Sequence, residues 1–408
     1  METLFLTLGA VFYRHNGRLF IEAQTASGLK AWHQHFDRVI ACSICKAGLP
    51  PKGWVDAEAE GIVLPEFELI ELPDGYHLPV FLKTRAEVRQ IMLDALCRAD
   101  YRLFAIGGWV GDWGVVGARL ASDNGLPHGI WFDRVESQVF AASHDGSLKG
   151  RLKARIKSAI TARTELELLG RADLALLHGQ TVYDSFVDWT RNAQIVEDIH
   201  LEASDHIPEA ELAEKLGSAE TDVLRIAYVG RADRMKGGLL WVEALARLAK
   251  TGVDFVAEWA GDGPLLEEMR DLADQRGIAD RIRFHGFVSD RQKVLGILRR
   301  AHLLLFCHMT DESPRNLIEA LFAATPLIGF RDTYAGRLVS EQGAGILVDR
   351  SDVAALAEAL SGLEADRAKL CDLIEKAGRS GLHLTRSQVF AHRAKIVKDN
   401  LGHDREAA

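Results

Sequence analysis

Two stretches of the sequence decide the fold and the candidate site: V-L-R-I-A-Y-V-G-R-A-D-R-M-K-G-G, residues 223–238, and D-E-S-P-R-N-L-I-E-A-L, residues 311–321. The first is an apolar, strand-like segment followed by a glycine-rich loop that carries Arg231 and Lys236. A forked guanidinium and a mobile ammonium suit a diphosphate, so this loop is a candidate phosphate site. The alternative is a solvated basic loop without a ligand.

The second stretch predicts the start of a helix, with Ser313 as the N-cap and Pro314 at the first helical position. The free N–H groups and the positive dipole end of a helix attract phosphate. Asp311 and Glu312 precede this start, and Glu319 follows about two turns later, almost in register with Glu312. Such carboxylates suit sugar hydroxyls. The alternative is a favourable acidic first turn and a solvated helix face.

Apolar strand-like segments alternate with amphipathic helical segments along the chain. This alternation predicts an α/β fold with parallel sheets that are covered by helices on both faces. Because the segments form two series, we expect two Rossmann-like domains. The predicted strands are Leu4–Phe12, Val39–Ile44, Phe67–Leu72, Leu103–Ile106, Gly129–Phe132, Leu174–Leu177, Leu224–Val229, Phe255–Ala260, Ile282–Val288, Leu303–Cys307, Leu327–Phe330 and Ile346–Val348.

A polar, acidic stretch around Pro208 marks the domain boundary. We expect an N-terminal domain at residues 1–205, a linker at 206–222 and a C-terminal domain at 223–380. Residues 381–408 should form a C-terminal helix, for which a return to the N-terminal domain is one alternative.

The bulk properties exclude several classes of protein. The 408 residues carry a net charge of −9, whereas a nucleic-acid binder should be basic. The first residues lack the basic segment of a signal peptide, and no apolar run reaches the ~18 residues of a membrane span, which predicts a cytoplasmic protein. The five scattered cysteines, Cys42 and Cys45 included, are expected to be structural. No metal-ligand spacing is found, so we expect neither a metal nor another cofactor.

Four motifs in order resemble those of one family over residues 223–350. They are the G-R-x4-K-G run, G-D-G-P at 261–264, F-H-G at 284–286 and the acidic stretch that leads into E-A-L-F-A-A-T-P at 319–326. This region resembles the nucleotide-sugar-binding domain of retaining GT-B glycosyltransferases of family 4. The resemblance implies two Rossmann-like domains that face a cleft. Ala324 stands where the family normally has Gly, which suggests slightly tighter packing.

The resemblance also implies roles for residues. Arg231 and Lys236 would contact the diphosphate and stabilise the leaving group, and Glu319 would bind the ribose. The acid that contacts the donor sugar is Asp311 by its spacing from Glu319, or Glu312 by the E-S-P-R-x-L-I-E-A-L pattern, and we take Glu312. The other donor-binding residues would be Gly230, Phe287, Val288, Ser313, Pro314, Arg315 and Asn316.

The N-terminal half resembles the family less. A glycine loop after the first strand is matched only by Gly17, and the alternative there is a plain hairpin turn at Asn16-Gly17. Asp133, six residues past Pro127, stands where the family often has a His near the sugar and acceptor. We include Asp133 in the site; the alternative is a structural ion pair with Arg134.

Residues 148–163 hold six basic residues and no acid, and Leu148, Leu152, Ile156 and Ile160 recur every four positions. This pattern predicts a basic amphipathic helix, which can lie on an anionic membrane. The alternative is a helix packed on its own sheet with a solvated basic face.

The resemblance therefore predicts a retaining glycosyltransferase. It would move a sugar from a nucleotide diphosphate-sugar to a saccharide or lipid-linked acceptor, in bacterial polysaccharide or glycoconjugate synthesis. The alternatives are a nucleotide-sugar epimerase of GT-B fold and a non-catalytic glycan or nucleotide-sugar binding protein.

Overall fold

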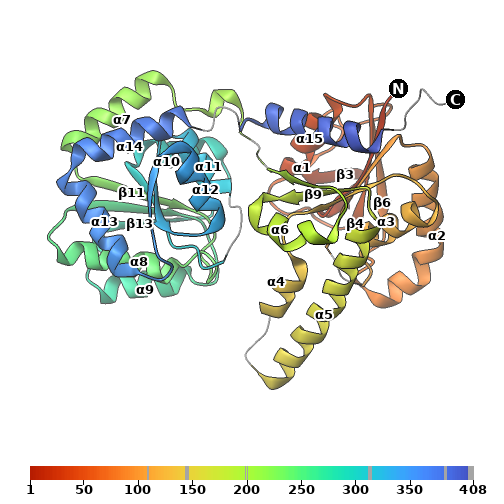
Figure 1. Ribbon diagram of the computed structural model, residues 1–408, viewed down its shortest axis with the longest axis horizontal. Coiled ribbons are helices and arrows are strands. Elements are labelled where there is room, and N and C mark those ends of the chain that lie inside the picture. Colours follow the sequence, from red (N-terminus) through yellow and green to blue (C-terminus); the bar gives the residue numbers. More distant parts are fainter. Residues whose placement is uncertain are drawn as a thin grey trace. The chain divides into compact units, whose positions relative to one another are not determined.

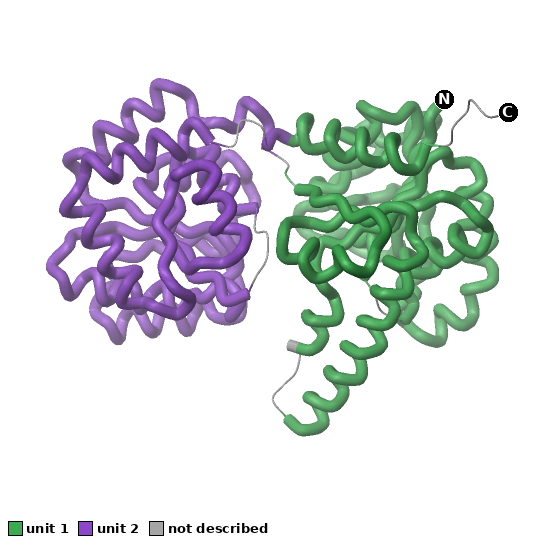
Figure 2. Tube along the Cα trace, viewed as in Figure 1, with its two compact units in different colours: residues 1–200, 386–408 green, residues 201–385 purple. Residues whose placement is uncertain are grey.

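The computed structural model describes residues 1–107, 110–142, 147–197, 199, 201–310, 315–380 and 384–402. The chain forms two compact units (Figure 2). Unit 1 comprises residues 1–200 and 386–408, and unit 2 comprises residues 201–385. Each unit is described by itself.

These boundaries differ from the expected ones at both ends of the C-terminal domain, because unit 2 begins at residue 201 and continues to residue 385. Residues 206–222, which we expected to be a linker, contain helix α7 (Glu209–Thr221), which packs against α10 and α14 within unit 2. Lys215 and Ala219 of α7 are buried. The stretch resembles a linker because it is acidic, has no strand and buries a lysine and an alanine rather than a stripe of large apolar residues.

Unit 1 is built on a twisted sheet with a parallel core in the order β10-β9-β8-β7-β1-β4, and β6 lies beside β4. The hairpin strands β2 and β3, with β5, extend the sheet past the end of β4. The strands are β1 (Thr3–Thr7), β2 (Phe12–His15), β3 (Arg18–Glu22), β4 (Arg38–Ala47), β5 (Trp54–Asp56), β6 (Phe67–Leu72), β7 (Tyr101–Ala105), β8 (Gly129–Phe132), β9 (Leu174–His178) and β10 (Ala193–Val196).

Helices cover both faces of this sheet (Figure 1). Successive strand residues point to opposite faces, so Phe5 packs with α2, α3 and α6 and Leu4 packs with α1 and α15. The helices are α1 (Ala23–His33), α2 (Leu78–Cys97), α3 (Trp113–Asp123), α4 (Glu136–Ala142), α5 (Leu148–Arg171), α6 (Gly179–Phe186) and α15 (Arg386–Leu401).

Unit 2 has a parallel sheet in the order β13-β12-β11-β14-β15-β16. Numbered within the unit, this order is 3-2-1-4-5-6, so the strand order reverses between β11 and β14, and ligands of such sheets bind beyond the carboxyl ends of the strands at this point. The strands are β11 (Leu224–Val229), β12 (Phe255–Ala260), β13 (Ile282–Gly286), β14 (Leu303–Phe306), β15 (Leu327–Phe330) and β16 (Gly345–Val348).

The helices of unit 2 form two packed groups. One group contains α8, α9 and α13, and the other contains α7, α10, α11 and α14. Their bounds are α8 (Gly238–Lys250), α9 (Leu266–Gln275), α10 (Arg291–Arg300), α11 (Arg315–Phe322), α12 (Thr333–Gln342), α13 (Val353–Ala365) and α14 (Arg367–Arg379).

The first predicted strand, Leu4–Phe12, is divided in the structure. β1 ends at Thr7, residues 8–11 form a loop, and β2 begins at Phe12. Asn16 and Gly17 then make the turn between β2 and β3, with φ values of 49° and 77°. Positive φ at both central residues defines a type I′ hairpin turn, so the hairpin alternative for Gly17 is confirmed. Gly17 therefore does not belong to the loop after the first strand.

The cysteines fit the structural interpretation. Cys42 and Cys45 are free thiols, and burial raises the pKa of Cys45 to about 12. A thiol with a raised pKa is a poor nucleophile and metal ligand. None of the helices that the structure describes combines the length and the apolar character of a membrane span.

Candidate active site

The loop at residues 230–237 is hydrogen-bonded to the segment that follows β14, the strand next to β11 at the switch point. The backbone N–H of Met309, just past β14, donates to the Met235 carbonyl oxygen over 2.7 Å. Gly237 has a φ of 65°, and a Cβ at this position would collide with the Cys307 carbonyl oxygen. Only glycine allows both the conformation and the close approach. The last glycine of the G-R-x4-K-G run therefore seats the loop against β14.

The G-D-G-P run packs on the same loop from the β12 side. A Cβ on Gly261 would collide with the Gly230 carbonyl oxygen, and the Ala232 N–H donates to the Asp262 carbonyl oxygen over 3.0 Å. Gly261 also forms a bridge with Gly286, at the end of the F-H-G run. Three of the sequence motifs thus meet at one edge of one sheet.

The loop presents its cations in different ways. The Arg231 side chain is 76% exposed, and its Nε lies 3.9 Å from the Asp233 carboxylate. Asp233 shapes the loop, since it accepts the backbone N–H of Lys236 over 3.0 Å. Lys236 is half-buried. An anion that approaches this edge meets Arg231 without first displacing a close ion pair.

Helix α11 is tied to the end of β11, across the switch point. The Asn316 amide donates to the Val229 carbonyl oxygen over 2.6 Å. Asn316 is buried, and its Oδ1 has no hydrogen-bond partner. A buried acceptor without a partner costs free energy, and a bound ligand that donates a hydrogen bond would recover it.

Glu319 lies one turn further along α11 and is half-buried. Burial raises the pKa of this carboxyl group, while the positive charges of Arg291 and Arg315 oppose the rise. Arg291 itself donates to Asp205 over 2.7 Å. Glu319 is therefore a partly desolvated acceptor, which is the character that recognition of a hydroxyl pair requires.

Other predicted donor residues are placed as follows. Phe287 and Val288 follow β13 at the same edge of the sheet, and the Phe287 side chain is 66% exposed. Arg315 is exposed at the first described position of α11. Asp311, Glu312, Ser313 and Pro314 lie outside the described residues, so the choice between the two acids stays a prediction.

Unit 1 has a pocket of about 640 Å³ at the carboxyl ends of β1, β7 and β8 and beside residues 42–44 of β4. Asp133 lies in this pocket with its side chain 65% exposed, 4.0 Å from Nδ1 of His178. Arg134 donates to Glu136 over 2.7 Å. The ion pair that we considered as the alternative role of Asp133 is thus made by Glu136. Asp133 remains available to a ligand of the pocket.

Three pocket residues escaped the sequence analysis. Gly9, in the loop after β1, occupies the place that we had given to Gly17. It could have been found as the glycine that interrupts the apolar run Leu4–Phe12, since glycine weakens the interior of a strand. Lys157 also lines the pocket, with its Nζ 3.6 Å from the centre of the Phe140 ring, and Tyr76 lines it from the segment before α2. No sequence signal separates Lys157 from its basic neighbours.

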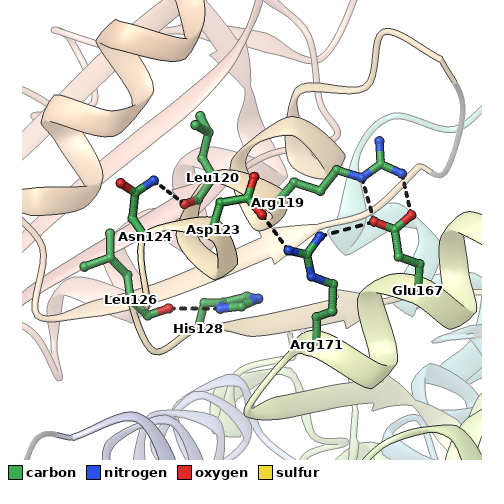
Figure 3. Close-up of polar contacts among 8 residues, drawn as sticks. All are labelled: Arg119, Leu120, Asp123, Asn124, Leu126, His128, Glu167 and Arg171. Carbon is green, nitrogen blue, oxygen red and sulfur yellow. Dashed lines mark hydrogen bonds and ion pairs between the residues drawn. The ribbon is translucent and has the colours of Figure 1, made fainter.

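His128, near Asp133 in sequence, is a structural residue. It is buried, and its Nδ1 lies 3.0 Å from the Leu126 carbonyl oxygen (Figure 3). The described residues contain no group of three or more His, Cys, Asp or Glu side chains that could hold a metal ion.

Two α/β units, with candidate ligand sites at the carboxyl edges of their parallel sheets, define the GT-B class of protein. Residues 209–380 match the model of the glycosyl transferases group 1 family. The resemblance to glycosyltransferases of family 4 is thereby confirmed.

Curated relatives carry names of sugar transfer. Alpha-D-kanosaminyltransferase of Streptomyces kanamyceticus is 27% identical over 176 residues, which are 43% of this chain and 45% of that protein. 2-Deoxystreptamine N-acetyl-D-glucosaminyltransferase of Streptomyces fradiae is 28% identical over 256 residues, which are 61% of this chain and 55% of that protein. The matches thus span about half the length of these relatives.

Solved structures share the fold over nearly the whole chain. Anabaena HepE in complex with UDP-glucose has a TM-score of 0.67 and 16% identity, and the match covers 98% of this chain and 100% of that one. WaaG, described as a glycosyltransferase involved in lipopolysaccharide biosynthesis, has a TM-score of 0.65 and 15% identity over 97% and 99% of the two chains. These likenesses confirm the GT-B fold.

Proposed function

We propose that the protein is a retaining hexosyltransferase that moves a sugar from a nucleotide diphosphate-sugar to a saccharide or lipid-linked acceptor. The observation that carries the proposal is the loop at residues 230–237, which holds an exposed Arg231 and a neighbouring Lys236 at the switch point of a group 1 domain. The names of the relatives, all sugar transferases, support the reaction class. Polysaccharide or glycoconjugate synthesis is the proposed setting.

In this proposal unit 2 binds the donor and the pocket of unit 1 binds the acceptor. The bond between the anomeric carbon and the diphosphate breaks while the acceptor oxygen attacks from the same face. The departing diphosphate takes up the proton of the acceptor hydroxyl, so configuration is retained. Arg231 and Lys236 stabilise the charge that develops on the diphosphate, a role that needs no metal. Glu319 holds the ribose, and Glu312 or Asp311 contacts the donor sugar.

Two measurements test this proposal. A thermal-shift screen with UDP-, GDP-, ADP- and TDP-sugars should raise the Tm with at least one base. The selected donor should then release nucleoside diphosphate only when an acceptor is present, and EDTA should not stop the release. An NMR spectrum of the product should show the anomeric configuration of the donor sugar. Interconversion of the nucleotide-sugar without acceptor would instead indicate an epimerase, and binding without turnover a binding protein.

Comparison of Asp311→Asn with Glu312→Gln identifies the acid that contacts the sugar. Only one of the two variants should lose turnover severely, because the proposal assigns the contact with the donor sugar to a single acid. Equal losses would show that neither acid has a distinct role.

We propose further that the protein is cytoplasmic and touches an anionic membrane surface through residues 148–163. The four aliphatic side chains of this stripe are exposed to solvent by 85% at Leu148, 61% at Leu152, 53% at Ile156 and 45% at Ile160. The aliphatic stripe is therefore not the face through which α5 packs on unit 1, and the alternative of a solvated basic helix without a membrane partner stays open. Lys149, Arg151, Lys153, Arg155 and Arg163 are exposed on the same helix, whereas Lys157 lines the pocket.

The other half of α5 explains how the stripe is presented. Glu167 accepts Arg119 of α3 over 2.7 Å and Arg171 over 3.3 Å, and Arg171 pairs with Asp123 (Figure 3). These ion pairs, with the buried Leu168 and Leu169, fix the carboxyl half of α5 to the body of unit 1. Its amino half extends beyond the sheet beside α4 (Figure 1). An apolar stripe flanked by cations fits an anionic lipid surface, to which each cation contributes about 1 kcal/mol.

Co-sedimentation with phosphatidylserine and phosphatidylcholine vesicles tests this contact. The wild type should bind anionic vesicles at low salt, and the binding should weaken as salt screens the charges. Changing Lys153 and Arg155 to Ser, or Leu152 and Ile156 to Ser, should abolish it. Leu82→Ser, an equally exposed leucine on α2, is the matched control and should bind as the wild type does. A wild type that ignores anionic vesicles at low salt would overturn the proposal.

A further inference from the structure

His308 lies just past the end of β14, on the far side of the switch point from the loop at residues 230–237. It is 1% exposed. Both of its chain neighbours touch that loop: Cys307 through the close approach of Gly237, and Met309 through its hydrogen bond to Met235. His308 is therefore held against the back of the candidate diphosphate loop.

A tyrosine on the neighbouring strand holds the ring of His308. The Tyr228 hydroxyl lies 2.8 Å from Nε2 of His308, and the two rings meet edge to face at 5.8 Å. The same hydroxyl would lie 2.9 Å from a Cβ built on Gly230, the first residue of the loop. The Tyr228–His308 pair thus sits directly beneath the loop and joins its first glycine to the end of β14.

The pair leaves one hydrogen-bonding position unused. Nδ1 of His308 has no partner, although the ring is buried. Burial and the positive charge of Lys236 lower the pKa of His308 well below its usual range, so the ring is neutral. A phenylalanine would fill the same space without an unsatisfied nitrogen. Packing alone therefore does not account for a histidine at this position.

A second buried histidine, at the other end of β14, provides the comparison. His302 immediately precedes β14, at the opposite end from His308. Its Nδ1 accepts the Arg225 backbone N–H over 3.2 Å, and its Nε2 lies 3.0 Å from the Ser218 hydroxyl. Both nitrogens of His302 are satisfied, as expected for a structural histidine. Of these two histidines, only His308 has a ring nitrogen without a hydrogen-bond partner.

We propose that His308 is a positioning residue for the diphosphate of the donor. Tyr228 fixes the ring, the ring supports the loop and holds Lys236 in place, and Nδ1 gains its hydrogen-bond partner when a nucleoside diphosphate draws the loop onto the site. The inference rests on the proposed donor site of unit 2 and adds a residue that acts through Lys236 rather than on the substrate.

Calorimetry with the nucleoside diphosphate selected by the donor screen, UDP in the first instance, tests the inference. His308→Gln places an amide near Nε2 but leaves nothing at Nδ1, so it should weaken UDP binding about tenfold. In a Lys236→Ala background the same change should have no further effect, because a residue that acts through Lys236 loses its means of action. His302→Gln should lower the Tm and leave UDP affinity unchanged.

Tyr228→Phe provides a second variant in case His308→Gln does not fold. It keeps the buried ring and removes only the hydroxyl, and it should weaken UDP binding several-fold. Wild-type UDP affinity in both variants, or an equal loss from His308→Gln with and without Lys236, would overturn the inference. If the wild type binds none of UDP, GDP, ADP and TDP, the proposed function itself fails and the inference falls with it.

Discussion

Buried polar side chains at the two edges of the sheet in unit 2 differ in how completely they are hydrogen-bonded. At the amino edge, Lys215 donates to the Leu298 and Ala323 carbonyl oxygens and to the Thr325 hydroxyl, with distances of 3.3, 2.9 and 2.8 Å. At the carboxyl edge, Asn316 and His308 each keep one unsatisfied atom. Lys215 thus has its hydrogen bonds completed within the protein, whereas Asn316 and His308 each have one atom without a partner.

The difference reflects what each edge must do. Burying a polar group costs free energy unless it is hydrogen-bonded, so an edge that only stabilises the fold should pair every group. An edge that binds a ligand must keep donors, acceptors and charges for it. The comparison therefore predicts that substitutions at the amino edge change stability and that those at the carboxyl edge change binding and turnover.

The largest effect should come from the cations of the carboxyl edge. Arg231→Ala and Lys236→Ala should each lower turnover by roughly 10²-fold or more, because each removes electrostatic stabilisation of the leaving diphosphate. The Tm should not change. Arg276→Ala, which breaks a surface ion pair with Glu243, is the control and should keep full turnover. Near-wild-type kinetics in both loop variants would remove the loop from the site.

His302 should make the stability of the amino edge depend on pH. Burial, together with the charges of Lys215, Arg225 and Arg367, lowers the pKa of His302 to about 3, whereas the unfolded residue titrates near ~6.5. Between about pH 6.5 and pH 3, only the unfolded state binds the proton. The contribution of neutral His302 to the free energy of unfolding is therefore complete above about pH 6.5. It is lost at about 1.4 kcal/mol per pH unit as the pH falls toward 3.

Urea unfolding of the wild type and of His302→Gln at pH 7 and pH 5 measures this effect. The stability advantage of the wild type should shrink by about 2 kcal/mol between the two conditions, since only the wild type has this proton to exclude. Nucleotide affinity should be the same in both proteins. An advantage that does not change with pH would show that the folded His302 titrates normally.

Glu319 should have a smaller effect on binding. Glu319→Ala should weaken the binding of free UDP about tenfold, the equivalent of ~1.4 kcal/mol for hydrogen bonds to a charged acceptor. Glu319→Gln should retain part of the affinity, because an amide oxygen still accepts from a hydroxyl. Glu358→Ala, an exposed glutamate on α13, is the control in calorimetry. Unchanged UDP affinity in Glu319→Ala would exclude the ribose role.

Unit 1 extends the comparison to a second carboxyl edge, with the smallest expected effect. Asp133→Asn should lower turnover about fivefold, the scale of one hydrogen bond of ~1 kcal/mol, without changing UDP affinity. Asp133→His, which introduces the residue usual in the family, should keep more activity than Asn. Steady-state kinetics at saturating donor separates these outcomes. Equal activity of the wild type and Asp133→Asn would show that Asp133 lines the pocket without a role in turnover.

The strands of the core could be predicted because each is a local apolar run. The predicted segments Phe255–Ala260 and Leu224–Val229 match β12 and β11 residue for residue. Helix α7 was missed because its buried residues, Lys215 and Ala219, carry no apolar signal. The division of Leu4–Phe12 was missed because loop residues 8–11 are themselves small and apolar.

The candidate site could be predicted where glycine geometry is local and not where partners are distant. Gly230 and Gly237 indicate a loop that lies close to neighbouring atoms. In the structure a Cβ on Gly230 would collide with Tyr228, and one on Gly237 with the Cys307 carbonyl oxygen. Ala324 was expected to tighten packing, but it also adopts a φ of 53°, the left-handed conformation that glycine favours at a helix end. The identity of a residue does not reveal the φ angle that the fold imposes on it.

By itself, the sequence determined that this is a two-unit α/β protein with a cationic, glycine-rich loop after a buried strand. Apolar periodicity, turn residues and charge spacing act over a few residues, and they are readable without the fold. Only the tertiary structure decided that Tyr228 meets His308, that Asp133 faces a pocket together with Gly9, and that the stripe from Leu148 to Ile160 is exposed. These are contacts, or missing contacts, between segments far apart in the chain. They depend on the order in which parallel strands associate, which local propensity does not specify.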